Sequence, residues 1–379
     1  MKVIFRLLLF LTIFLSGCGK IEMNDASIPL GIGTDYKDGK IIISAQLAKP
    51  SSQETSGGQT PQFQVITASG KTFSEAVRNT SFSLSTIPLW SHTQVSVLGE
   101  GLAKHDIRSL VDFLVRNRFA RKNNQMVVTH NVTPEEILNV NPILENYTSI
   151  SIKNLVKIQE SQLGIYTPVD TTELLQRLAS PGIEPVAPMI TIRKNGKEKA
   201  LLLDGTAVFK GTRMIGRLNE MESRGYRLMS PKMLQGGLFL IPSPLGDKQW
   251  ITIELSRSQA KITPQIQGQH IKMKIIINAE GNLYEQSGSQ NLFSPEIFKQ
   301  IEKATAQEMA QQISLCIRKA QTLNSDILGW GQMIYRSDAE IWSNFEPEWN
   351  QVFPATPYDI EVNFSLRRSY LTDKSLVVR

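Results

Sequence analysis

The chain has 379 residues, with 41 Lys and Arg against 35 Asp and Glu, which gives a formal charge of +6. This mild excess lacks the clustered basic residues of a nucleic-acid-binding protein, so we predict no nucleic-acid partner. The two cysteines are too few for a disulfide scaffold, and the chain is long enough for more than one hydrophobic core.

The first residues have the order of a bacterial export signal. Two basic residues accompany a nearly unbroken apolar run that ends at residue 15, which is shorter than the roughly 20 residues that span a bilayer. The small residues Ser16 and Gly17 follow, directly before Cys18. We therefore predict a lipoprotein signal peptide over residues 1–17, cleavage before Cys18, and lipidation of the Cys18 thiol.

Two acyl chains on Cys18 would hold the protein stably on a membrane, whereas one chain gives only marginal binding. Later apolar runs, such as residues 41–43 and 275–277, have the length of strands, and we expect no further membrane span. Cys316 is the only other cysteine, so the exported body has no internal disulfide to form.

Residues 18–190 are predicted to form an N-terminal α+β domain. A serine- and glycine-rich loop is expected at residues 51–60, where the sequence has nothing to bury. A threonine cap, a proline at the first helical position and a glutamate three residues after the cap start a helix at Thr133. The predicted strands are residues 30–35, 40–47, 63–67, 93–98 and 125–129, and the other predicted helices are residues 71–84, 102–118 and 170–180.

Prolines near residue 190 mark a boundary, and residues 191–247 are predicted to be a small middle β-rich domain. Its strands are expected at residues 201–210 and 213–218, on either side of a tight turn. Proline and glycine then become frequent up to residue 246, where we place the second boundary.

Residues 248–379 are predicted to form a C-terminal α+β domain. Three strands from Gln249 onward end at residue 277, and a final strand covers residues 358–366. Ser294 and Pro295 start a long helix over residues 295–322 with an apolar stripe on one side. The predicted fold class is therefore α+β: three mixed α/β domains with largely antiparallel sheets, the last with a long helix packed on a sheet.

Few residues suggest catalysis, metal binding or cofactor binding. His92, His105, His130 and His270 are scattered without metal-ligand spacing, so we predict no metal site. Cys316 lies on the apolar stripe of the long helix, which favours a buried, inert thiol over a nucleophile. The Gly31-Ile-Gly33 sequence lacks the helix that follows a dinucleotide loop, which favours a strand or turn. We predict no cofactor.

The acidic residues are interpreted as helix caps and solvated faces, because sequence spacing gives no opposed carboxylate pair. They are Glu135, Glu136, Asp338, Glu340, Glu346 and Glu348. We predict no catalytic residue. Trp330, Trp342 and Trp349 lie close together in the sequence, which favours packing of their segment onto the long helix over a ligand-stacking or partner-binding surface.

Four stretches together resemble the Ger(x)C family, the lipoprotein C-subunits of spore germinant receptors. They are residues 91–103, 110–121, 203–210 and 324–331, and the last stretch has the family's Asp-x-x-Gly-x-Gly pattern at Asp326, Gly329 and Gly331. Tryptophans and a phenylalanine follow it. The chain departs from the family next to Cys18, where Gly19 stands in place of the common tryptophan.

The resemblance implies a three-domain, mixed α/β lipoprotein without known catalysis. The resemblance also implies that the protein works beside two other subunits in a complex that senses nutrients. One is an A-type subunit, and the other is a B-type subunit that is similar to amino-acid transporters. The expected location is the outer face of the cell membrane, which is the inner membrane of the spore. The resemblance does not identify the nutrient or the contact residues.

Two other functions were weighed. A solute-binding lipoprotein would deliver a small nutrient to a membrane transporter, and two similar lobes joined by a hinge would favour it. A surface hydrolase would need a nucleophile or metal motif. The sequence instead predicts unlike domains and contains neither kind of motif, so we favour a non-enzymatic receptor subunit that acts through protein contacts.

Overall fold

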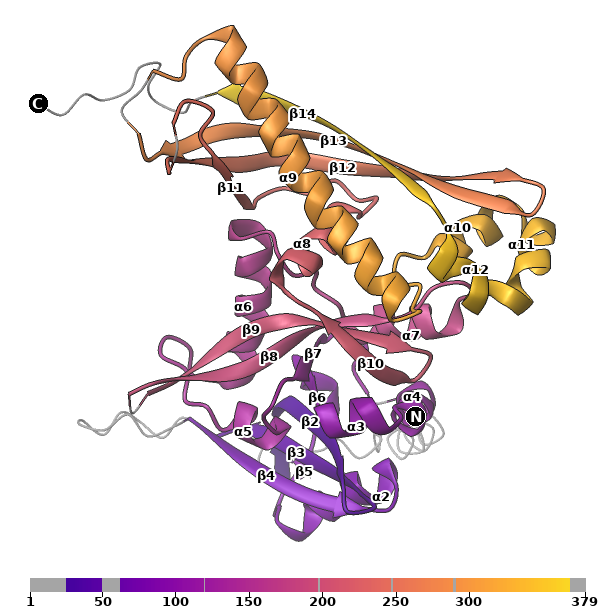
Figure 1. Cartoon of the computed structure of the whole chain (residues 1–379). Helices are drawn as coiled ribbons and strands as arrows, with labels where there is room; N and C mark the ends of the chain where they lie inside the picture. Colours follow the sequence, from indigo (N-terminus) through magenta and orange to yellow (C-terminus); the bar gives the residue numbers. More distant parts are fainter. Residues whose placement is uncertain are drawn as a thin grey trace, which may run out of the picture.

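The structure is a computed structural model of the chain and describes residues 25–49, 62–118, 120–196, 198–246, 248–288 and 291–368. The predicted signal peptide, Cys18 and the loop at residues 51–60 lie outside this part of the chain. None of the helices described is long and apolar enough to cross a membrane. In Figure 1 a four-stranded sheet lies above an eight-stranded sheet, with helices around and between them.

The eight-stranded sheet is mixed. In sheet order its strands are β10 (Arg213–Leu218), β9 (Glu198–Lys210), β8 (Val186–Asn195), β7 (Gln125–Thr129), β6 (Val95–Leu98), β2 (Pro29–Lys37), β3 (Lys40–Ala48) and β4 (Phe63–Gly70). The four central strands, from β8 to β2, run parallel, and antiparallel pairs extend the sheet on both sides. We call this sheet and its helices, residues 26–218, the N-terminal module.

Helices cover both faces of this sheet, so its central strands are buried on both sides. Val97 and Val127 pack on one face, while Leu98 and Val128 pack on the other. This is the usual environment of parallel strands. The first face carries α5 (Pro134–Leu138) and α6 (Thr148–Gln162); the second carries α2 (Phe73–Asn79), α3 (Glu100–His105), α4 (Arg108–Arg116) and α7 (Thr171–Ala179).

Two predicted helices of this module differ in detail. The helix predicted at residues 102–118 is broken into α3 and α4, because the backbone of Asp106 is extended and its carboxylate accepts from Arg108 N at 2.8 Å. The helix predicted at residues 71–84 ends at Asn79 and continues as the short 3-10 helix η2 (Thr80–Phe82). The cap predicted at Thr133 is confirmed as a complete capping box.

A two-stranded parallel sheet lies in the lower part of the N-terminal module, near the label β5 in Figure 1. There β1 (Ala26–Ser27) pairs in parallel with β5 (Ile87–Pro88), and the 3-10 helix η3 (Trp90–His92) follows. The first described residues are therefore tied to the turn that follows η2.

The C-terminal module, residues 220–368, contains the four-stranded sheet. Its strands in sheet order are β11 (Leu238–Pro242), β12 (Trp250–Gln267), β13 (His270–Gln286) and β14 (Tyr358–Arg368). Only two strands follow Gln249 where three were predicted, because β12 and β13 form one long hairpin that turns at Gly268. The long helix α9 (Pro295–Thr322) crosses one face of this sheet (Figure 1), with the predicted bounds and the Ser294 cap.

Five further helical segments complete the described part of the C-terminal module. The helix α8 (Glu220–Leu228) packs closely on α9, since a Cβ on Gly225 would lie 2.1 Å from Gln312 O. The segment after α9 contains α10 (Trp330–Ser337), α11 (Ala339–Phe345), the 3-10 helix η4 (Glu346–Glu348) and α12 (Trp349–Ala355). The predicted mixed α/β class with largely antiparallel sheets, and with a long helix on the last one, is confirmed.

The segment predicted as a middle domain, residues 191–247, divides its strands between the two sheets. The boundary predicted at residue 190 falls inside β8, which pairs with β7 on one side and β9 on the other. The strand β11 joins the other sheet. The hydrogen bonding of the larger sheet therefore runs across residue 190, and the division into three domains stays a prediction.

Candidate functional site

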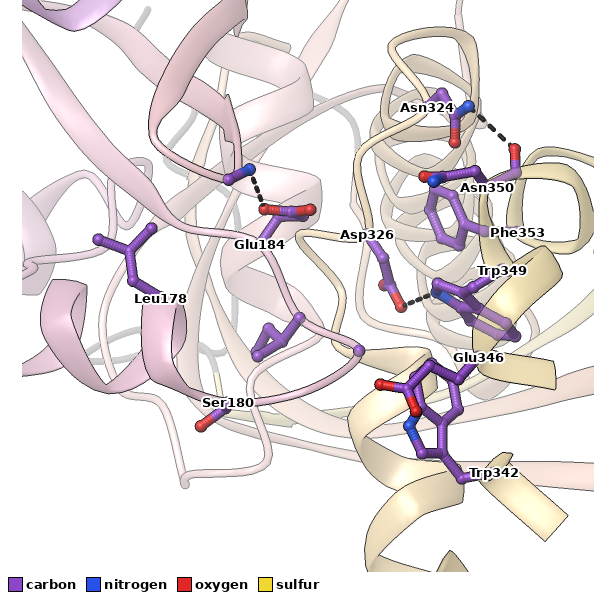
Figure 2. Close-up of a pocket in the computed structure, with 13 residues that line it drawn as sticks. Leu178, Ser180, Glu184, Asn324, Asp326, Trp342, Glu346, Trp349, Asn350 and Phe353 are labelled. Atoms are coloured by element: carbon purple, nitrogen blue, oxygen red, sulfur yellow. Dashed lines mark hydrogen bonds between the residues drawn. The ribbon is translucent and has the colours of Figure 1, made fainter. Parts of the chain in front are cut away.

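A cavity of about 270 Å³ lies where the two modules meet (Figure 2). One wall comes from the N-terminal module, from the end of α7 to Glu184 together with Gly211 in the β9–β10 turn. The other wall comes from the C-terminal module, from Asn324, Asp326 and residues between 342 and 353. Asp326, the first residue of the Asp-x-x-Gly-x-Gly pattern, therefore lines the cavity.

Asp326 holds the C-terminal wall together. Its Oδ1 accepts from Trp330 N at 3.0 Å, and its Oδ2 accepts from Gly331 N at 2.8 Å and from the indole Nε1 of Trp349 at 3.1 Å. The first two donors are the free N–H groups at the start of α10, which need a partner outside the helix. One carboxylate thus fixes α10 relative to α12.

Asp326 is only 5% exposed. Burial raises the pKa of this carboxyl to about 7, although the three N–H donors favour its charged form. Its donors are two backbone amides and an indole, with no cationic side chain paired to it among the described residues. The junction therefore contains a carboxyl group that titrates near neutral pH.

The backbones of the two modules touch beside this carboxyl. Gln332 N donates to Gly182 O at 2.8 Å, and Glu184 N donates to Asp326 O at 2.9 Å. A Cβ on Gly182 would lie 2.4 Å from the backbone carbon of Gly331, so a side chain here would force the modules apart. The contact is made directly by main chain.

The glycines of the Asp-x-x-Gly-x-Gly pattern have physical roles here. Gly329 has a φ of +69°, a left-handed conformation that favours glycine. A Cβ on Gly331 would lie 2.7 Å from the Trp342 ring and 2.8 Å from Gly182 Cα. The pattern therefore supplies an acceptor, a left-handed residue and a point of close approach.

The three clustered tryptophans are buried, with exposed fractions of 0% for Trp330, 4% for Trp342 and 9% for Trp349. Trp342 and Trp349 meet edge to face with 5.2 Å between ring centroids, and Trp330 meets Phe353 in the same way at 5.5 Å. They share a hydrophobic core with the apolar stripe of α9. The packing interpretation of these residues is confirmed.

Glu184 is the acidic residue of the opposite wall. Its carboxylate accepts from Gly211 N at 2.6 Å, and burial raises its pKa, against the opposing effects of that amide and Lys210. Figure 2 shows Glu184 and Asp326 on the two walls of the cavity. Such a cavity could accept a small polar molecule, but both carboxyls already accept hydrogen bonds that hold their own walls together.

A second polar cluster joins three strands of the N-terminal module. The Asp204 carboxylate lies 2.6 Å from His130 Nδ1 and 3.2 Å from Arg217 Nη1. Burial acts to raise the pKa of Asp204, but the hydrogen bonds from His130 and Arg217 outweigh it and hold the pKa below its usual value. Asp204 belongs to the family-like stretch at residues 203–210, and here it links β9 and β10 to the residue that follows β7.

The structure does not bring the four histidines together. His92 lies in η3, His105 ends α3 and His270 begins β13, whereas His130 belongs to the cluster with Asp204. Within the described ranges, no group of three or more His, Cys, Asp or Glu side chains is placed to hold a metal ion.

Cys316 is fully buried and burial raises its pKa, which confirms the prediction of a buried thiol. The capping interpretation is confirmed for Glu136, which completes the box with Thr133, and for Asp338, which accepts from the first amides of α11. Gly31 and Gly33 lie in strand β2, as predicted. Cys18 lies outside the described residues and stays a prediction.

Sequence reasoning missed the N-terminal wall of the cavity. Gly182 and Glu184 lie just beyond the helix predicted at residues 170–180, and neither was predicted to contact the other module. Asp326 was named as part of a family pattern, without a structural role. Their local sequences carry no sign of the contact, because each gains its partner from the other module.

Two family models match the chain. One, described as "Spore germination protein N-terminal domain", matches residues 19–192, and the other, described as "Spore germination B3/ GerAC like, C-terminal", matches residues 204–370. Together they cover most of the chain and leave a gap within the β8–β9 hairpin.

Relatives match over nearly their whole length. The chain is 26% identical to spore germination protein KC of Bacillus subtilis over 98% of this chain and 96% of that protein. It is 21% identical to spore germination protein B3 of the same organism over 96% of each chain, and 20% identical to spore germination protein GerQC of Bacillus cereus over 97% and 99%.

A solved structure shares the fold. The crystal structure of the GerBC protein matches with a TM-score of 0.54 and 17% identity, over 89% of this chain and 96% of that one. The arrangement of sheets and helices described above is therefore also found in an experimentally determined relative.

Proposed function

This chain belongs to the spore germination family of B3/GerAC-like proteins, the C-subunits of germinant receptors, and from that premise we propose that it is a lipid-anchored, non-catalytic receptor subunit. In this proposal lipid on Cys18 places the body on the outer face of the inner spore membrane. There it contacts A-type and B-type subunits and helps to trigger germination.

The observation that carries the proposal is the sequence before Cys18 combined with family similarity that begins at residue 19. A tether restricts the protein to the membrane surface, which raises its effective concentration beside membrane-embedded partners. The residues of the junction fit a structural role, because the Asp326 carboxylate is occupied by α10 and α12.

The solute-binding alternative receives less support. A nutrient carrier that closes around its ligand would be expected to have two similar lobes. The two modules here have different strand orders, and backbone hydrogen bonds join them at Gly182 and Glu184.

Function is tested by deleting the gene in a host strain that lacks other receptors of this class, and by exposing the spores to a panel of single nutrients. We expect loss of response to at least one nutrient, with recovery when the parent gene is restored. An unchanged response to every nutrient would contradict the receptor role.

The anchor is tested by Cys18→Ala, with Cys316→Ala as the matched control. Cys18→Ala should release the body from spore membranes or leave the precursor uncut, whereas Cys316→Ala should stay in the membrane fraction. Mass spectrometry of the parent protein should find a diacylated cysteine at the mature N-terminus. An unmodified Cys18 in the native host would refute the anchor.

A further inference from the structure

The turn formed by η2, β5 and the residues between them, residues 80–88, carries two exposed apolar side chains. Phe82, in η2, is 89% exposed, and Ile87, in β5, is 52% exposed. Ser81 and Ser83 on either side of Phe82 are exposed too, so the phenylalanine lies in a fully exposed stretch of three residues. A single exposed apolar residue needs no explanation, but two on one turn beside the predicted anchor do.

The turn is held by the fold. Thr80 Oγ1 donates to Val77 O at 2.6 Å, and Ser83 N donates to Thr80 O at 3.0 Å. Leu84 packs on the small core around Leu47. Phe82 is therefore presented on a fixed support, so little backbone entropy would be lost when it meets a partner.

The turn also lies next to the point at which the described chain begins. Ala26 pairs with Ile87, and Ser27 pairs with Pro88. Cys18 precedes Asp25, the first described residue, by seven positions, and an extended chain of that length spans at most about 25 Å. A lipid on Cys18 would therefore bring this end of the N-terminal module to the bilayer surface.

Exposed basic residues flank the turn. Arg78 lies in the last turn of α2, two residues before η2. Lys49 follows Ala48, whose N–H donates to Ile28 O beside β1. Lys71 is a third exposed basic residue in this part of the chain, and Asp25 and Glu75 are the acidic ones, so the local charge is mildly positive, which suits anionic headgroups.

We propose that residues 80–88 form a membrane-contacting surface, with Phe82 and Ile87 inserted into the interfacial region of an anionic phospholipid bilayer beside the lipid on Cys18. The inference rests on the proposed lipidation of Cys18. It sets the orientation of the body: β4, α2 and β5 face the membrane, and the four-stranded sheet at the other end of Figure 1 projects away from it.

Cysteine labelling tests this on the full-length, lipidated protein. Phe82→Cys receives a polarity-sensitive maleimide dye, and Leu240→Cys on β11 is the matched control, because Leu240 is also exposed, at 55%. Background labelling should be absent, since Cys316 is fully buried and the Cys18 sulfur would carry lipid. Each labelled protein is reconstituted into vesicles of phosphatidylethanolamine and phosphatidylglycerol.

We expect the dye at position 82 to shift to shorter wavelength on vesicles, to be quenched by a spin-labelled lipid, and to be protected from aqueous iodide. The dye at position 240 should show the opposite behaviour. Equal iodide quenching at the two positions, in protein with a diacylated Cys18 by mass spectrometry, would overturn the inference and leave the anchor intact.

One other result would also overturn it. Protection at position 82 that requires added receptor subunits and is absent with lipid alone would assign the turn to a protein contact.

Discussion

The junction around Asp326 and the outer face of the four-stranded sheet use carboxylates in opposite ways. Asp326 is buried and accepts from backbone and indole N–H groups. Glu280, on the outer face of the sheet, accepts from Arg257 and Arg367, each at 2.6 Å. Burial raises the pKa of Asp326 to about 7, whereas the two arginines lower the pKa of Glu280 to about 2.

The difference shows what each region requires. A buried carboxyl with neutral donors is costly to keep charged, but its hydrogen bonds fix three segments at defined positions. Ion pairs on a solvated face, such as Lys272 with Asp359, contribute little because water and salt compete with them. We therefore expect the junction to govern the stability and relative placement of the modules, and the sheet face to tolerate change.

The largest effect is expected from Asp326→Ala. It leaves three buried N–H groups without an acceptor, which should lower the free energy of unfolding by roughly 3 to 5 kcal/mol in chemical denaturation. Asp338→Ala is the matched control, because Asp338 also accepts from two amides at a helix start but lies on the surface. Its loss should cost about 1 kcal/mol. Equal losses of unfolding free energy in Asp326→Ala and Asp338→Ala would contradict the expected difference between the buried junction and the surface.

The second largest effect is expected on the pH dependence of stability, through the Asp326 carboxyl. The folded pKa of Asp326, about 7, lies above the ordinary value near 4, so the folded state holds this proton more tightly. Its contribution to stability is full below about pH 4, falls as the pH rises to about 7, and then stays level. Asp326→Asn should flatten this part of the profile of unfolding free energy against pH. The same slope in parent and variant would contradict the assignment.

Gly331→Ala should have a moderate effect, because the added methyl group would press on the Trp342 ring and on Gly182. We expect a loss of about 1 to 3 kcal/mol in unfolding free energy. Gly246→Ala is the control, since a Cβ there would meet its nearest neighbour at 3.4 Å, an ordinary contact. A neutral Gly331→Ala would show that the junction is loosely packed.

The smallest effect is expected from Glu280→Gln on the sheet face. At neutral pH it should change the melting temperature less than the other substitutions do, and less still at high salt. Because the pKa of Glu280 is lowered to about 2, its contribution is present above about pH 4.5 and disappears as the pH falls toward 2. A large, salt-independent decrease in melting temperature at neutral pH would contradict the expected difference between the sheet face and the junction.

Much of the local structure could be predicted from sequence. Ser294, Pro295 and the apolar stripe predicted the bounds of α9, and the strand predicted to end at residue 277 lies within β13. The helix α6 escaped prediction because polar residues, including Thr148 and Gln159, occupy its buried face. Their side chains are satisfied by backbone groups of neighbouring segments, Thr148 by Leu138 O and Val140 O and Gln159 by the backbone of Tyr166, and apolar periodicity does not reveal such bonds.

The candidate site was only partly predictable. The burial of Trp330, Trp342 and Trp349 followed from their clustering, whereas the cavity wall at Gly182 and Glu184 left no local signal. The position of Cys18 as the lipid site, and the surface at residues 80–88, remain proposals with direct tests.

The sequence by itself determined where many of the helices and strands form, because caps, turns and apolar periodicity act over a few residues. Only the tertiary structure decided how β8 to β11 divide between two sheets and how Asp326 is buried. These depend on contacts such as that between Arg177 Nη1 and Ile327 O, which are 150 residues apart in the chain. Such contacts form only where both modules pack together, and local propensity carries no information about them.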